Sequence, residues 1–318
     1  MLSSLKFVQG AVSHKDLVPE LSHFQIKDGR ISGYNGVISL SAPIDLDIET
    51  NPRAKPFIKA VEHCEEQAVM YMTKGGKLAI KSGKFRAYLS SLPQQDLQEF
   101  KKPSGEPHQI PEGFIAALKA VKPFIGVDAS RPWSHGTLVK NGSLFATNNI
   151  CFVEQWLGYG LPTINIPSKA VAELVRINEQ PVAMSVEGSW VTFFFEGDRW
   201  LSAHLYATDW PDVADRLFED PGDPQEFPQG FWEAFNKLKP FLGEDNAVYL
   251  KEDQLSTSQH EEDGTTVDIE GVMAGPIFNY KVMSLLQGIA TAIDLDSYPK
   301  PCQFTGGNLR GVIVGMRG

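Results

Sequence analysis

The hydrophobic and polar positions of the chain follow two periods, one typical of strands and one typical of helices. Strict alternation of apolar and polar residues predicts strands, whereas apolar residues three and four apart predict amphipathic helices. Alternation is densest over residues 182–195, which reach a turn signal at 196–198 and continue as a second run at 199–205. A similar strand pair is predicted over 77–89. Both regions are expected to form antiparallel hairpins.

The helical period recurs along the whole chain. Helices are predicted at residues 15–24, 53–64, 112–122, 168–177, 229–239 and 280–288. In the third of these, Phe114, Leu118 and Val121 lie along one stripe, which is the pattern of a helix with one buried face. Extended runs follow each helix. We therefore expect six copies of a helix followed by several strands.

Two internal similarities set the period of the chain. Residues 110–126 match residues 227–243 without a gap, an offset of 117 residues, and residues 29–35 resemble residues 142–148, an offset of 113. The second pair follows the turn signals Asp28-Gly29 and Asn141-Gly142, which are typical of tight hairpins. With polar stretches near 94–107 and 219–226, these offsets predict three domains, 1–106, 107–218 and 219–318.

Composition places the protein among soluble globular chains. Hydrophobic residues make up 42% and charged residues 21% of the 318 residues, and no apolar run has the length of a membrane span. The three cysteines, Cys64, Cys151 and Cys302, are far apart and form no CxxC pair. We expect no disulfide framework and no zinc site, which suits a reducing cytoplasm.

The formal net charge of −10 argues against a nucleic-acid partner unless the charge is segregated. Acidic residues gather in predicted strands and loops, for example at 45–49, 219–223 and 261–263. An acidic exterior around a basic surface would leave that surface attractive to DNA. Whether DNA can be a partner therefore depends on where the 29 basic residues lie.

No enzyme motif is present in the sequence. Asp45, Asp47 and Glu49 could share one side of a strand, as a metal site might require, but a solvated strand face explains them better. The acidic stretch 260–264 is better explained as a turn, and Ser134-His135 has no matching nucleophile motif. The chain also lacks a GxxxxGK[ST] loop. No catalytic residue, metal or cofactor is predicted.

Over its whole length the chain resembles the bacterial sliding clamp family, the beta subunit of the replicative DNA polymerase. The resemblance rests on the strand pair at 77–89, on Phe145-Ala-Thr-Asn-Asn149, on Trp210-Pro-Asp212 and on the terminal run 312–317. It implies an α+β fold, a three-domain DNA clamp in which each domain holds two β-α-β-β-β repeats, with helices lining a ring hole and sheets outside.

The resemblance also implies a function and partners. Members are processivity factors: a homodimeric ring encircles double-stranded DNA without sequence preference, tethers a DNA polymerase and is placed on DNA by a clamp loader. They are not enzymes, bind no membrane and act in the bacterial cytoplasm, or in the host cytoplasm if phage-encoded. Asn148-Asn149 stands where the family has Asp-Gly, and residues 256–266 are less regular, which points to a divergent or phage-encoded member.

If helices line a hole that holds DNA, the face opposite each apolar stripe should be basic. Most of the predicted helices meet this test, and the residues expected to face DNA are Lys15, Arg53, Lys55, Lys59, Lys119, Lys122, Lys169, Arg176, Lys237, Lys239 and Lys281.

The resemblance further implies a pocket that receives peptides from partner proteins. Matching the family's pattern residue by residue places these positions at the pocket: Thr137, Leu138, Thr147, Ile150, Phe152, Pro211, Leu217, Val312, Val314 and Met316. Without the resemblance, most of them are ordinary apolar strand positions.

Two other interpretations stay open. One is a trimeric clamp with two domains per chain, which the offsets of 113 and 117 residues disfavour. The other is an enzyme of unknown type on a repeated α+β scaffold, for which a pocket with convergent titratable groups would be the discriminating observation.

Overall fold

The computed structural model describes residues 1–13, 18–65, 67–93, 103–128, 130–206, 210–211, 214–220, 222–260 and 263–317. Contacts divide the chain into two compact units. The first combines residues 1–115 with 169–206, and the second combines 116–168 with 207–318. Each unit therefore joins segments that are distant in the sequence.

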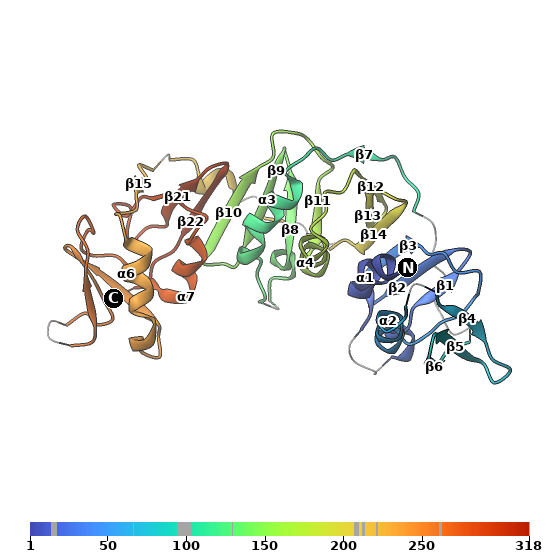
Figure 1. The fold of residues 1–318 in the computed structure, drawn as a ribbon. Coiled ribbons are helices and arrows are strands. Elements are labelled where there is room, and N and C mark those ends of the chain that lie inside the picture. Colours follow the sequence, from blue (N-terminus) through green and yellow to red (C-terminus); the bar gives the residue numbers. More distant parts are fainter. Residues whose placement is uncertain are drawn as a thin grey trace. The chain divides into compact units, whose positions relative to one another are not determined.

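The first unit is built on a seven-stranded antiparallel sheet (Figure 1). In spatial order its strands are β1 (Gln25–Lys27), β2 (Arg30–Tyr34), β3 (Ile38–Pro43), β14 (Arg199–His204), β13 (Trp190–Phe195), β12 (Ala183–Glu187) and β7 (His108–Gln109). The central pairing, β3 with β14, sets Leu40 opposite Leu201 across about 160 residues of sequence.

Three helices and a smaller sheet complete this unit. The helices are α1 (Leu2–Val8), α2 (Ala54–Glu62) and α4 (Ser168–Ile177), with short 3-10 turns at Gln9–Ala11 and Pro19–Ser22. The smaller sheet is a meander of β4 (Val69–Met72), β5 (Lys77–Ser82) and β6 (Phe85–Ser90), with β5 in the centre.

The second unit holds an eight-stranded antiparallel sheet. Its spatial order is β11 (Ile164–Pro167), β8 (Gly136–Lys140), β9 (Ser143–Thr147), β10 (Cys151–Trp156), β22 (Leu309–Ile313), β21 (Cys302–Gly306), β20 (Ala292–Ile293) and β15 (Gln225–Glu226). The central pairing, β10 with β22, joins strands about 160 residues apart. Figure 1 shows β22, the last strand of the chain, running beside β10.

A four-stranded sheet and several short helices make up the rest of this unit. The sheet has the order β18 (Thr266–Asp268), β17 (Gln254–Ser256), β16 (Ala247–Lys251) and β19 (Ile277–Asn279). The helices are α3 (Phe114–Val121), α5 (Ala214–Leu217), α6 (Phe231–Lys237) and α7 (Tyr280–Met283), and 3-10 turns lie at Lys122–Phe124, Pro132–His135, Lys239–Phe241 and Ser284–Leu286.

Five of the six predicted helices are confirmed, and the first is wrong. Within 18–24 only Pro19–Ser22 form a 3-10 turn, while 14–17 lie outside the described residues. The first helix is α1 instead, in which Leu5, Phe7 and Val8 are buried against β2 and β3. A seven-residue helix is too short to show a clear period in the sequence, and its stability comes from packing.

The predicted hairpin turns are confirmed with the expected backbone geometry. Asp28 and Gly29 have φ of 51° and 68°, and Asn141 and Gly142 have 52° and 76°. Positive φ at both central residues matches the twist of the strands that a two-residue hairpin joins. Asn149 also takes a left-handed φ of 72°, which asparagine tolerates far better than a branched residue does.

The predicted β-α-β-β-β repeat is present in four of the six copies. The order β7-α3-β8-β9-β10 recurs as β11-α4-β12-β13-β14, β15-α6-β16-β17-β18 and β19-α7-β20-β21-β22. The copy at 1–43 starts with its helix, and before α2 only isolated bridges at Thr50, Pro52 and Arg53 take the place of a leading strand in the described residues. The division into three domains stays a prediction.

Candidate nucleic-acid and peptide-binding surfaces

The helices carry a charge opposite to that of the whole chain. Together α1, α2, α3, α4, α6 and α7 hold eight basic and three acidic residues, a net charge of +5 in a chain of −10. Two of the three acidic residues, Glu173 and Glu233, are paired within their own helix. The charge segregation that the sequence left open is therefore present, and it places cations on the helices.

Helix α2 shows the arrangement most clearly. Phe57 and Ala60 are buried on one side of the helix, whereas Lys55 and Lys59 are exposed one turn apart on the other. Arg53 is exposed at the residue that precedes the helix. This helix offers phosphate groups a pair of cations on a short, rigid element.

Arg176, which the sequence assigns to DNA, has partners within the protein. Its guanidinium donates to both carboxylate oxygens of Glu173, at 2.5–2.9 Å, and to the backbone carbonyls of Lys6 at 3.2 Å and Phe7 at 2.9 Å. The Glu173 side chain is 7% exposed, so Arg176 neutralises a buried carboxylate and ties α4 to the end of α1. Lys169, at the other end of α4, is exposed.

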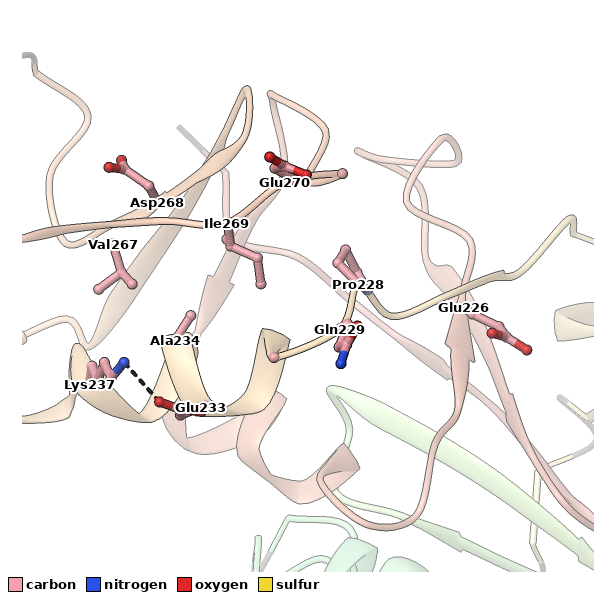
Figure 2. Close-up of a pocket in the computed structure, with 12 residues that line it drawn as sticks. Glu226, Pro228, Gln229, Glu233, Ala234, Lys237, Val267, Asp268, Ile269 and Glu270 are labelled. Carbon is pink, nitrogen blue, oxygen red and sulfur yellow. Dashed lines mark ion pairs between the residues drawn. The ribbon is translucent and has the colours of Figure 1, made fainter.

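Lys237 also has a partner, and it lines a groove of about 830 Å³ between α6 and residues 267–271 (Figure 2). Its ammonium is 2.9 Å from the carboxylate of Glu233, and this contact lowers the pKa of Glu233. The carboxylates of Glu226, Asp268 and Glu270 point in different directions around the groove (Figure 2). Since these groups do not converge on one point, the groove gives no support to the enzyme interpretation.

The remaining predicted cations vary in position. Lys119 and Lys281 are exposed on helices, and Lys122 and Lys239 are exposed on the 3-10 turns that follow α3 and α6. Lys15 lies outside the described residues. The prediction missed Lys6, which is exposed on α1, because it placed the first helix elsewhere.

Several predicted pocket residues meet on one face of the eight-stranded sheet. Leu138, Phe152 and Val312 form a buried cluster with Phe145, and three partly buried side chains pack on it: Trp210, Leu217 and Phe218. The register explains the cluster, because Leu138 is opposite Phe145 and Phe152 is opposite both Thr147 and Val312. Residues directly opposite in antiparallel strands share a face.

Exposed apolar side chains lie next to this cluster. Ile150 and Val314 are 42% and 43% exposed, and the backbone amide of Val314 donates to the carbonyl of Ile150 at 2.9 Å. Met316 is half-buried, and its backbone is fixed at both ends, by Ile277 and by the hydroxyl of Tyr298. Pro211 is also half-buried. An apolar rim beside an aromatic floor is suited to peptide binding.

Thr137 does not share the face that holds the cluster. It precedes Leu138 on β8, so its side chain points to the other side of the sheet, where Val139 is buried. The prediction that Thr137 and Leu138 line one pocket is therefore wrong for Thr137, because neighbouring residues of a strand point to opposite faces of the sheet.

The structure also adds a charged pair, Arg310 and Glu154, to the predicted surface. Arg310 is opposite Glu154 on the face of the cluster, and its guanidinium lies 2.7 Å from the Glu154 carboxylate. The same guanidinium stands 4.2 Å from the ring centroid of Phe218. Arg310 and Glu154 are 156 residues apart in the sequence, so the spacing of residues gave no signal for this contact.

In the described part of the chain, no group of three or more His, Cys, Asp or Glu residues could hold a metal ion. Burial raises the pKa of Cys151 to about 12, and burial together with Asp294 raises that of Cys302 to about 12. In the described segments, no helix is long and apolar enough to cross a membrane.

Comparison with known proteins shows which fold this architecture has. Neither a protein-family model nor a curated protein matches the sequence. Solved structures do match, among them DNA polymerase sliding clamps from Pseudomonas aeruginosa (19% identity, 99% of this chain and 97% of that one), Caulobacter crescentus and Bacillus subtilis (each 17%, 100% and 97%), all at a TM-score of 0.83. The chain has the sliding-clamp fold.

The match covers 99–100% of this chain and 97% of the solved ones, so the α+β clamp fold expected from the sequence is confirmed. At 17–19% identity the likeness concerns the fold, and no residue's role follows from it.

Proposed function

We propose that this protein is a DNA sliding clamp, a non-enzymatic processivity factor that encircles duplex DNA and tethers the replicative polymerase. The observation that carries the proposal is the reversed charge of the helices on a clamp fold, +5 against −10 for the chain. Cations on helices attract the phosphate backbone without reading sequence, and an acidic remainder disfavours DNA elsewhere.

A closed ring requires more than one copy of the chain. With three domains per chain, two copies would complete the ring, and the expected molar mass in solution is about 70 kDa, twice the 35.1 kDa chain. Light scattering at micromolar concentration measures it. A monomer would contradict a stable ring, and a trimer would favour the two-domain interpretation.

Retention on DNA tests the role of the helices. The double variant Lys55→Glu, Lys59→Glu should lose retention on nicked circular DNA and shorten primer extension, because both side chains are exposed on α2. The variant Lys27→Glu, Lys300→Glu has the same net charge, and its two exposed lysines lie outside helices. Equal loss in both variants would show a general charge effect and remove the case for the helices.

The same retention assay separates encirclement from ordinary binding. A ring held topologically should stay on closed or nicked circles and leave linear DNA by its ends. Direct binding to linear duplex should be weak and should fall steeply with salt, since phosphate contacts alone are involved. Tight, sequence-dependent binding to a linear duplex would contradict the proposal.

We also propose that the cluster of Leu138, Phe145, Phe152 and Val312, with the rim of Ile150 and Val314, binds peptide tails of the polymerase and the clamp loader. The support is chemical: when a short peptide binds, a few of its side chains buried against an apolar, aromatic surface supply most of the binding energy. One shared surface would make the partners compete.

The test uses the rim, because changes to the floor would also disturb the core. Ile150→Asp with Val314→Asp should abolish binding of the cognate polymerase tail in calorimetry, and the fold should remain since both side chains are exposed. Val182→Asp, at a side chain 41% exposed in the first unit, is the matched control. Undiminished affinity in the rim variant would place the peptide site elsewhere.

A further inference from the structure

The face of the eight-stranded sheet that holds the aromatic cluster extends beyond it. Because side chains on a strand alternate, Glu154 and Trp156 lie on the same face as Phe152, about 7 and 13 Å further along β10. On the neighbouring strand β22, Arg310 is opposite Glu154. The apolar cluster therefore continues into a charged pair and then into a tryptophan at the far end of β10.

Trp156 is 58% exposed, although tryptophan is a residue that folded proteins mostly bury. Its backbone amide donates to the carbonyl of Asn308 at 2.9 Å, and the amide of Leu157 donates to the carbonyl of Gly142 at 2.8 Å. The indole lies against Gly158, where a Cβ would come within 3.6 Å of the ring. The backbone is thus fixed and the ring packed before any ligand binds, which lowers the entropy that binding costs.

Arg310 uses one edge of its guanidinium within the protein. Its Nε and Nη2 atoms both lie 2.7 Å from one carboxylate oxygen of Glu154, and the other oxygen accepts from the hydroxyl of Ser143 at 2.7 Å. The guanidinium also stands 4.2 Å from the ring centroid of Phe218. Among the residues that the structure describes, none accepts a hydrogen bond from Nη1, and the side chain is 53% exposed. The other edge can therefore bind a planar acceptor such as a carboxylate.

The strands around this charged pair carry little negative charge. Glu154 is the only acidic residue in β8, β9, β10, β21 and β22, which also hold the cations Lys140 and Arg310. The Glu154 side chain is 15% exposed, so Arg310 largely covers it. In a chain of net charge −10, an acidic ligand meets less repulsion on these strands than it does near the acidic loops.

We propose that Trp156 and Arg310, which we call the distal patch, form a second contact for the partner peptide whose anchors bind at the cluster. The segment beside those anchors places a carboxylate on Arg310 and packs a bulky apolar side chain on Trp156. The two contacts are continuous, because Phe218 touches both Phe152 of the cluster and Arg310. The inference rests on the proposed peptide site, and it specifies the partner: an acidic and then an apolar residue within about four extended positions of the anchors.

The size and charge of the distal patch favour a peptide over a second copy of the chain or DNA. A stable interface between proteins buries about 800 Å² on each partner, far more than two side chains offer. DNA binding draws on several cations that are not neutralised, whereas Arg310 is paired with Glu154. A short peptide needs only a few well-placed contacts, and an exposed tryptophan beside an arginine supplies two of the residue types that dominate such binding.

Fluorine NMR of the full-length protein labelled with 5-fluorotryptophan tests the proposal. The chain has six tryptophans; Trp156 reports on the distal patch and Trp210, which packs on the cluster, reports on the anchor site. Trp156→Phe and Trp210→Phe assign the two signals. The probes are a 20-residue peptide from the cognate polymerase tail and the shortest truncation of it that still binds in calorimetry. The long peptide should shift both signals, and the short one should shift the Trp210 signal alone.

Calorimetry measures how much the distal patch contributes. Trp156→Ala should weaken binding of the long peptide about tenfold and leave the short peptide within about twofold, because only the long one reaches the patch. Changing the acidic residues of the long peptide to their amides should weaken binding to the wild type and have little further effect on Arg310→Gln, since the pair is then already broken. Val182→Ala, an apolar truncation in the first unit, is the matched control and should bind both peptides normally.

The two reporters separate failure of this inference from failure of the proposed peptide site. If the long peptide shifts the Trp210 signal and not the Trp156 signal, the distal patch is overturned and the anchor site stands. If the peptide binds and shifts neither signal, both are overturned. An altered molar mass of Trp156→Ala would assign the patch to contacts between copies. A Trp156 shift on adding a DNA duplex without peptide would assign it to DNA. Either result would overturn the proposal.

Discussion

Replacing Arg176 by alanine distinguishes the role predicted from the sequence from the role that the structure shows. The sequence assigns Arg176 to DNA, whereas in the structure it neutralises Glu173 and donates to the carbonyls of Lys6 and Phe7. A buried pair that loses one partner is destabilised by about 3–5 kcal/mol, because the other charge stays buried. Arg176 is 38% exposed, so solvent screens part of the interaction, and about 2 kcal/mol is expected.

The effect should concentrate on the contact between α1 and α4. Hydrogen exchange followed by mass spectrometry reports it in peptides that span residues 1–13. A loss of about 2 kcal/mol in the free energy of local opening corresponds to exchange roughly 30-fold faster. Peptides of the four-stranded sheet β16–β19, which belongs to the second unit, should exchange at their normal rate.

Two further variants separate a structural role of Arg176 from a role in DNA binding. Lys169→Ala removes an exposed cation from the same helix, so it should leave exchange unchanged and weaken DNA retention. Glu173→Leu with Arg176→Leu removes the unpaired charge and should recover at least half of the lost protection. If Arg176→Ala exchanges within twofold of the wild type and loses DNA retention, the structural role is refuted and the sequence-based one stands.

Three other predictions concern single residues. At pH 8 a thiol reagent should modify Cys64 first and leave Cys151 and Cys302 unmodified until the protein unfolds. Burial raises the pKa of both buried thiols to about 12, so they stay protonated. Mass spectrometry of the modified peptides measures this, and early modification of Cys151 would contradict it. Gly311→Ala should lower the denaturant midpoint, since a Cβ there would meet backbone at 2.7 Å, whereas an unchanged midpoint would mean that the strands separate freely. Asn149→Gly should be neutral or stabilising and Asn149→Val destabilising in the same measurement, because φ is +72°, and the reverse order would contradict that geometry.

Much of the fold could be predicted from the sequence, because turns and helices depend on local physical chemistry. Hairpin turns such as Asp28-Gly29 follow from residues that accept positive φ, and helices such as α2 and α4 follow from a stripe of apolar residues over nine or ten positions. The internal repeats extended these local signals to the whole chain, and for this reason the clamp fold could be predicted from the sequence.

The tertiary structure alone decided which distant segments meet. Helix α1 carries too few residues to be periodic and forms because β2 and β3 bury it. Arg176 has partners within the protein because the fold brings two backbone carbonyls about 170 residues away and a buried carboxylate to its guanidinium. The aromatic cluster exists because β22 pairs with β10. Periodicity fixes which face of an element is apolar, but it contains nothing about which other element will cover that face, and the partner settles the chemistry.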